Sequence, residues 1–203
     1  MQDGYDAINT QDFNIGLHEL CYKFGEVKQM NHCLAGACHG GHLDTVKEIL
    51  QCENPPTNCN MGLLYASKNG FLSIVKLMIE HKADNLDGAL WNACLYGHKE
   101  VAMYLVEIGA KKFEQCLYSA ISANQLEIVK WLLDSKLAQT VDAGLLHACN
   151  VRKIAIIRLL FTYKPTNIKE CRDQMLKLKH GDYAKIALLL EKELTNALWN
   201  NSV

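Results

Sequence analysis

Residues 34–50 read Leu-Ala-Gly-Ala-Cys-His-Gly-Gly-His-Leu-Asp-Thr-Val-Lys-Glu-Ile-Leu, and this stretch decides the fold because its pattern recurs along the 203-residue chain. The pattern begins again at Leu63, Leu90, Leu117 and Leu145. An alanine holds the same place in every copy, at Ala37, Ala66, Ala93, Ala120 and Ala148, with spacings of 29, 27, 27 and 28 residues. A fixed period of this length indicates stacked supersecondary units rather than one globular core.

The first half of each copy predicts a short helix that ends in a tight turn. Four residues after the alanine stand Gly41, Gly70, Gly97, Asn124 and Arg152. Glycine and asparagine most readily take the left-handed conformation that closes a helix. Arg152 departs from this rule, so we expect a different or strained turn in the fifth copy.

The second half of each copy carries an apolar stripe at helical spacing. In the second copy the stripe is Leu72, Val75, Met78 and Ile79, with Lys76 and Glu80 between its members. This spacing predicts an amphipathic helix. One helix–turn–helix unit cannot bury its stripe alone, so we predict an all-α solenoid of stacked helix–turn–helix repeats.

The two chain ends are less regular than the middle. We interpret residues 1–203 as a single repeat domain, with residues 1–33 as an N-terminal cap and residues 34–190 as about five to six repeats. Residues 191–203 are predicted to form a C-terminal cap helix. In the N-terminal cap, the apolar residues between Ile15 and Phe24 predict a helix that ends at Gly25. Near the other end we align Lys177 with the alanine of the earlier copies.

Composition narrows the classes of function. The formal net charge is −1, so no overall field attracts nucleic acid or an anionic membrane. No stretch reaches the roughly 18 consecutive apolar residues of a membrane span. The N-terminal residues are polar and lack a signal-peptide apolar segment. We therefore expect a cytoplasmic protein with reduced cysteines that binds neither nucleic acid nor membrane.

Two stretches carry a family resemblance. Residues 41–50 and 97–106 resemble the second-helix half of an ankyrin repeat, and the latter runs on to Gly109-Ala110 as that motif does. The resemblance covers roughly residues 34–190. Only the leucine of the usual Thr-Pro-Leu-His opening is present, and the copies are shorter than the usual ~33 residues. An ankyrin-like fold with its projecting hairpins shortened to tight loops is therefore expected.

The resemblance implies a function without catalysis or cofactor: binding a partner protein on the concave face formed by the first helices. In that frame the exposed positions are Tyr65, Lys68, Asn69, Asn92, Leu95, Tyr96, Ser119, Ser122, His147 and Asn150. Trp91, Tyr118, Trp131 and Trp199 are instead assigned to the core. The style of the units also resembles proteins of large DNA viruses and of some protists. The viral resemblance implies a host factor as partner and the host cytoplasm as location.

A metal-dependent or thiol-based enzyme or regulator is the alternative from another class. Residues 32–59 are rich in potential ligands, namely His32, Cys33, Cys38, His39, His42, Cys52 and Cys59. Structural zinc sites need four ligands at suitable spacing. Here Cys38 recurs as Cys94 and Cys149 at the same repeat position, which favours a packing role. Nucleic-acid binding is a further alternative, disfavoured by the absence of Lys and Arg on the predicted groove.

Overall fold

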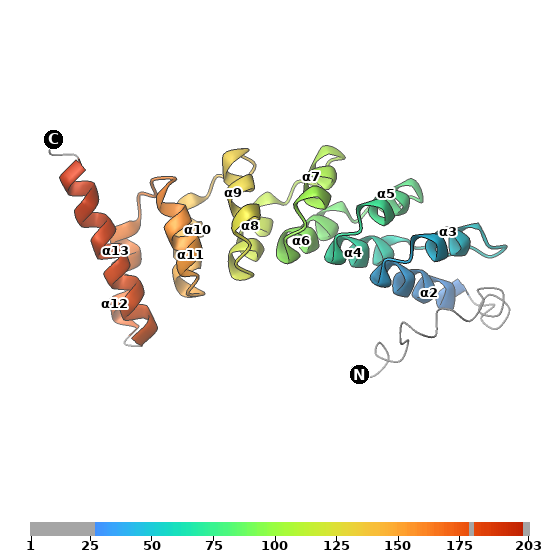
Figure 1. Cartoon of the computed structure of the whole chain (residues 1–203), viewed down its shortest axis with the longest axis horizontal. Helices are drawn as coiled ribbons and strands as arrows, with labels where there is room; N and C mark the ends of the chain where they lie inside the picture. The colour runs from blue at the N-terminus through green and yellow to red at the C-terminus, as the bar shows by residue number, and fades with distance from the viewer. Residues whose placement is uncertain (1–26, 179–180, 201–203) are drawn as a thin grey trace. The chain divides into compact units, whose positions relative to one another are not determined.

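The computed structural model describes residues 27–178 and 181–200, and the side chains of residues 30–178 and 181–196 (Figure 1). The described backbone forms helices and no strand: α2 (Val27–Gly40), α3 (Leu43–Gln51), α4 (Asn60–Asn69), α5 (Leu72–Glu80), α6 (Leu86–Tyr96), α7 (Lys99–Glu107), α8 (Phe113–Ser122), α9 (Leu126–Asp134), α10 (Val141–Asn150), α11 (Ile154–Phe161), α12 (Ile168–Lys177) and α13 (Gly181–Asn200). The all-α prediction is confirmed. The helix expected between Ile15 and Phe24 lies outside the described residues.

The chain divides into two compact units. The first contains Met1–Ala93 and His98–Lys111, and the second contains Cys94–Gly97 and Lys112–Val203. Helix pairs α2–α3, α4–α5 and α6–α7 build the first unit, except that the last turn of α6 belongs to the second. Pairs α8–α9, α10–α11 and α12–α13 build the rest of the second unit. Within each unit, the first and second helices of a pair alternate along the chain as the repeat pattern predicts.

The repeated small residues lie in the core, as predicted. Ala66 and Ser67 are fully buried in the first unit, and so are Ala148 and Cys149 in the second. Of the stripe predicted on α5, Val75 and Met78 are fully buried, whereas Leu72 and Ile79 have intermediate exposure and Ile74 is buried in addition. The fold is therefore held by small side chains where first helices meet and by aliphatic stripes beneath the second helices.

The turn after each first helix keeps one geometry through all five copies. Gly41, Gly70, Gly97, Asn124 and Arg152 have φ of 77°, 78°, 84°, 62° and 58°. Arg152 thus adopts the same left-handed turn despite its side chain, at a cost in backbone strain. Its guanidinium Nη1 lies 3.6 Å from an Asp182 carboxylate oxygen and its Cζ 5.7 Å from the Tyr183 ring centroid. The expectation of strain is confirmed, while that of a different turn is wrong.

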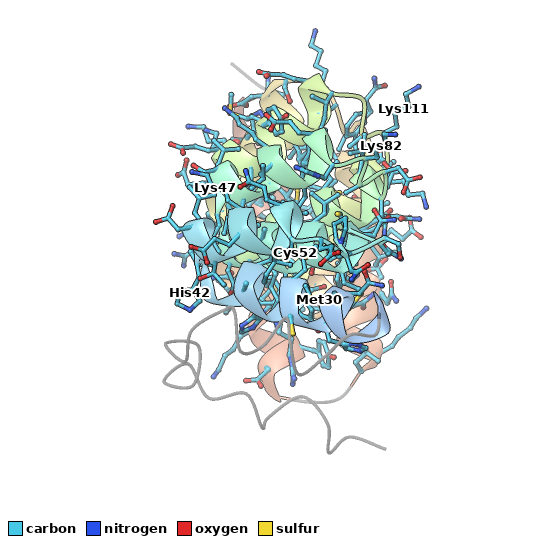
Figure 2. All side chains as sticks on the ribbon, turned by 90° about the vertical axis from the view of Figure 1, so that its right-hand side faces the viewer. Met30, His42, Lys47, Cys52, Lys82 and Lys111 are labelled. Carbon is cyan, nitrogen blue, oxygen red and sulfur yellow. The ribbon has the colours of Figure 1, made fainter. Side chains whose placement is uncertain are left out.

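Short loops join each second helix to the next first helix. In the first unit the loop after α5 spans residues 81–85 and contains Lys82 in a left-handed conformation, with φ of 64°. Figure 2 shows Lys82 and Lys111, which both follow second helices, on one side of this unit and His42 on the other. We call these sides the loop edge and the turn edge. The described loops hold no strand, so the predicted shortening of the hairpins is confirmed.

A polar side chain near the start of each first helix from α2 to α10 accepts a backbone N–H from the next loop. The bonds run from Thr57 and Asn58 to Asn31 Oδ1 (3.1 Å each), from Asp84 and Asn85 to Asn60 Oδ1 (2.9 and 3.0 Å), from Lys111 to Asp87 Oδ1 (2.7 Å), from Gln139 to Glu114 Oε1 (3.0 Å) and from Thr166 to Asp142 Oδ1 (2.7 Å). Each acceptor stands six residues before the repeat alanine. We call this series the loop clamp; its period was not recognised from the sequence.

At the turn edge, side chains bond to the carbonyls that end the preceding first helix. Asn69 Nδ2 donates to His39 O at 3.1 Å, and Gln125 Nε2 donates to Leu95 O at 3.1 Å. His98 Nε2 lies 2.9 Å from Lys68 O. The first helices α2, α4 and α6 are thus tied at both ends.

The expected cap boundaries fall inside continuous helices. The boundary at residue 33 lies within α2, whose Met30 is 4% exposed, and the boundary at residue 190 lies within α13. Lys177 is the exposed last residue of α12, and its alignment with the repeat alanines is wrong. Helix α12 starts 27 residues after α10, which places Met175, 1% exposed, at the alanine position. A single domain over residues 1–203 stays a prediction.

Candidate functional site

The first helices of the first compact unit present one common face. Asn60, the first residue of α4, bonds to the loop just before α6, and Lys68 O near the end of α4 meets His98 just after α6. The two helices therefore run parallel, and residues at equal repeat positions point the same way. We call the exposed side of α2, α4 and residues 86–93 of α6 the first-helix face of the first unit.

The predicted residues of this face are partly buried rather than fully exposed. Tyr65, Lys68, Asn69 and Asn92 all have intermediate exposure. The rings of Tyr65 and His39 meet edge-to-face with centroids 5.3 Å apart. Asn69 Nδ2 also donates to Tyr65 O at 3.1 Å, and Asn92 Nδ2 donates to Gly88 O at 3.2 Å. The two amides are therefore already engaged by the backbone.

Trp91 is the main residue of this face that sequence reasoning missed. It was assigned to the core, but it is 43% exposed, so that assignment is wrong. The physical reason is its angle on α6: Leu90 and Ala93 are fully buried, and Trp91 follows Leu90 by one residue, about 100° around the helix. Met61 on α4 is also exposed, at 40%. Met61, Tyr65 and Trp91 share this face, and we call these three side chains the Trp91 cluster.

Two other aromatic residues assigned to the core are neither buried nor exposed. Tyr118 and Trp131 have intermediate exposure. The side chain of Trp199 lies outside the described residues. Two residues before the repeat alanine, Leu64, Tyr118 and Leu146 have intermediate exposure, whereas Ala35 of the first copy is buried. The register therefore gave no uniform signal for Trp91.

The second compact unit has an equivalent face on the end of α6, on α8 and on α10. Tyr96 is 44% exposed, Leu95 and His147 have intermediate exposure, and Ser122 and Asn150 are exposed. Ser119 was expected here but is only 8% exposed. Its hydroxyl donates to Cys116 O of the same helix at 2.9 Å, which turns the short side chain inward. Its assignment to an exposed face is therefore wrong.

Ser122 and His147 form a polar pair on this second face. Ser122 Oγ lies 2.8 Å from His147 Nε2, and the His147 ring meets Tyr118 edge-to-face with centroids 5.3 Å apart. A serine nucleophile also needs donors aimed at an oxyanion. The nearby N–H groups of Ala123 and Asn124 instead donate to Ser119 O and Ile121 O at 3.0 and 3.1 Å. The arrangement favours a link between neighbouring repeats over an acyl-transfer site.

The Cys/His-rich segment 32–59 is dispersed by the fold. His32 and His39 are exposed, while Cys38 is fully buried and its thiol donates to Met78 Sδ at 3.7 Å. Burial, with a smaller effect from Cys59, raises the pKa of the Cys38 thiol to about 12. Such a thiol stays protonated at neutral pH, whereas nucleophiles and metal ligands are thiolates. Among the described residues, no group of three or more His, Cys, Asp and Glu is placed to hold a metal ion.

Membrane insertion has no candidate helix in the described part of the chain. None of those helices combines the length and the apolar character that a crossing requires.

Comparison with known proteins gives matches along most of the chain. The sequence model of a family described as "Ankyrin repeats (3 copies)" matches residues 34–116 and 63–144. Protein MGF 505-1R of African swine fever virus is 28% identical over 147 residues, which is 70% of this chain and 25% of that protein. The fowlpox virus protein FPV022 is 29% identical over 97 residues, 44% of this chain and 17% of that protein. The chain thus spans about a quarter or less of the length of these viral relatives.

A solved structure shares the fold. The human ASB11 ankyrin repeat domain superposes with a TM-score of 0.52 at 20% sequence identity, covering 66% of this chain and 69% of that one.

Proposed function

We propose a function from the premise that this chain belongs to the ankyrin-repeat family, whose model matches residues 34–144 in two overlapping stretches. Ankyrin repeats are generally protein–protein interaction modules. The chain would act without catalysis, holding a partner protein on the concave face that its first helices form. The strongest part of that face is the Trp91 cluster of the first compact unit.

The exposure of the Trp91 cluster carries this proposal. Met61 and Trp91 are 40% and 43% exposed, although burial of such side chains is normally favoured. Tryptophan and tyrosine dominate the energy of protein interfaces because they are large, stiff and amphipathic. Lys68, with intermediate exposure, adds one cation at the border. A partner that covers the cluster would remove its apolar surface from water.

The test compares two pairs of alanine substitutions in affinity capture from the native cell, followed by mass spectrometry. Tyr65→Ala/Trp91→Ala should lose the captured partner, because central aromatic residues typically cost at least ~2 kcal/mol of binding when truncated. Lys47→Ala/Lys76→Ala, on the exposed sides of α3 and α5, is the control and should keep it. Thermal melts of all variants establish that the fold is retained. Loss of the partner only with the lysine pair would place binding on the second helices and refute the proposal.

The second face extends the proposal to the other compact unit. Further contacts there would come from Leu95, Tyr96, Ser122, His147 and Asn150, with Tyr96 contributing most.

On the first unit, Asn69 and Asn92 would act mainly by holding the backbone beneath the partner, since their amides already bond to carbonyls.

We also propose that the partner is a host factor and that the protein acts in the host cytoplasm. Support comes from the viral origin of the relatives and from the eight free thiols of the described residues. Free thiols in this number fit a reducing compartment. Fractionation of infected cells would test the location, and recovery of the protein outside the host cytoplasm would contradict it. The metal-dependent or thiol-based alternative on residues 32–59 has no observation in its favour.

A further inference from the structure

Helix α13 is built differently from the other second helices. It is 20 residues long, whereas α11 has 8 residues. The buried residues of α11 are Ile156, Ile157 and Leu160, the third, fourth and seventh of that helix. In α13 they are Ile186, Ala187 and Leu190, the sixth, seventh and tenth. The buried stripe of α13 is therefore displaced by about one turn, and the helix continues well past it.

This displacement leaves a groove between α11 and α13 within the second compact unit. Two adjoining hollows, of about 530 and 630 Å³, are both lined by Arg158, Leu189 and Lys192. Ile154 and Leu188 line the second hollow and are 42% and 73% exposed. We call the two hollows together the α11–α13 groove. Four apolar side chains, those of Ile154, Phe161, Leu188 and Leu189, line it along both helices, and it lies on second helices.

The rim of the groove is basic. Arg158, Lys185 and Lys192 line it. Two acids also line the groove. Arg172 Nη1 donates to Glu191 Oε2 at 2.6 Å, and Glu193 lines the first hollow. Lys185 lies only 3.9 Å from Asp182, but both side chains are more than half exposed, so the pairing is weak. The charge left for a partner is positive.

We infer that the α11–α13 groove binds an amphipathic, acidic helix of a partner protein. An apolar groove between two helices accepts the apolar face of a third helix, through side chains spaced i, i+3 or i+4, and i+7. Glutamate or aspartate flanking the apolar stripe would meet Arg158 and Lys192, which favours acidic over basic helices.

The experiment uses the full chain and a phage-displayed library of helical peptides of about 14 residues, with Ala, Leu, Glu and Lys allowed at each position. Selected peptides are synthesised with a fluorescent label and titrated by anisotropy. Three variants are compared: Arg158→Glu/Lys192→Glu reverses the rim, Leu188→Ala truncates the exposed apolar residue, and Lys130→Glu on α9 is the matched control. These side chains are exposed, so the fold should be retained, and circular dichroism checks this.

The expected result is enrichment of peptides with leucine at helical spacing flanked by glutamate. Their binding should weaken at least about tenfold with Arg158→Glu/Lys192→Glu, weaken with Leu188→Ala, and stay within about twofold with Lys130→Glu. Failure to enrich any helix, enrichment of lysine-flanked helices, or binding insensitive to both groove variants would each overturn the inference. A concentration-dependent dimer dispersed by Leu188→Ala, with no peptide selected, would assign the groove to a second copy of the chain and likewise overturn it.

Discussion

Two glycines at the same repeat position offer a matched test of how tightly the first helices pack. Gly62 in α4 and Gly144 in α10 both stand four residues before the repeat alanine, Ala66 and Ala148, and both are buried. Replacing either by alanine gives the same gain in helix propensity, because both lie inside a helix. Any difference between the two variants therefore reports the space that the neighbouring side chains leave.

The structure predicts opposite outcomes. A Cβ added at Gly62 would lie 2.7 Å from Met78 Sδ and 2.9 Å from Cys38 Sγ, closer than real contacts allow. At Gly144 the nearest atom is Ile121 Cδ1 at 3.5 Å, an ordinary contact. Glycine to alanine in a helix gains about 0.8–1.0 kcal/mol, and overpacking costs about 1–3 kcal/mol. Gly144→Ala should therefore stabilise by up to about 1 kcal/mol, and Gly62→Ala should destabilise by up to about 2 kcal/mol.

Urea titration and thermal melts of the full chain measure both free energies of unfolding. For a chain of this size, 1 kcal/mol corresponds to roughly 2–4 °C in Tm. Adding Cys38→Ala should recover part of the loss in Gly62→Ala, because it removes one of the two clashing sulfurs, and the coupling should exceed about 0.5 kcal/mol. If Gly62→Ala proves as stable as Gly144→Ala, the packing of α4 against α2 and α5 has been misread.

Three further substitutions test separate features. Ala93→Leu should lower stability by about 1–3 kcal/mol or more, because Ala93 is fully buried; an unchanged melting temperature would mean that the repeat frame is misplaced. Lys136→Gly should raise stability by about 1 kcal/mol or less, because Lys136 has φ of 57°; a lower Tm would show that its side chain matters more than its backbone. Cys94→Ala should cost at most about 1–2 kcal/mol of stability. The intact mass of the native protein should show reduced thiols, and a mass lower by two hydrogen atoms, from a disulfide between Cys94 and Cys116, would contradict that expectation.

The fold was predictable because its period rests on backbone geometry and on residue size. Only glycine and asparagine take a left-handed turn without marked strain, and only small residues fit where helices meet closely. Gly70, with φ of 78°, and Ala66, fully buried, show both rules at work. Arg152 shows the limit of the first rule, because the surrounding repeat imposes the turn on a residue that disfavours it.

Individual surface positions were less predictable, because residue type gives no angle on the helix. Trp91 was assigned to a helix position that is often interior in this architecture, yet Leu90 and Ala93 already fill the interior of α6. Ser119 was assigned to the exposed face by the repeat frame, yet its hydroxyl bonds to its own helix and the residue is buried. The repeat register does not correct the second error, because Tyr65, Asn92 and His147 at the same position have intermediate exposure.

The loop clamp explains why the polar residues of the first helices say little about the partner. Asp87 and Asp142 read in the sequence as surface carboxylates, but their Oδ1 atoms each accept a backbone N–H at 2.7 Å, from Lys111 and Thr166. Hydrogen bonds to charged groups are worth about 1.5–3 kcal/mol, so these acids serve mainly to fix the next repeat. Recognition of a partner on the first unit then depends on side chains that do not bond to the next loop, and Trp91 is the largest of them. A partner that contacts this face should therefore be selected by shape and apolar contact more than by charge.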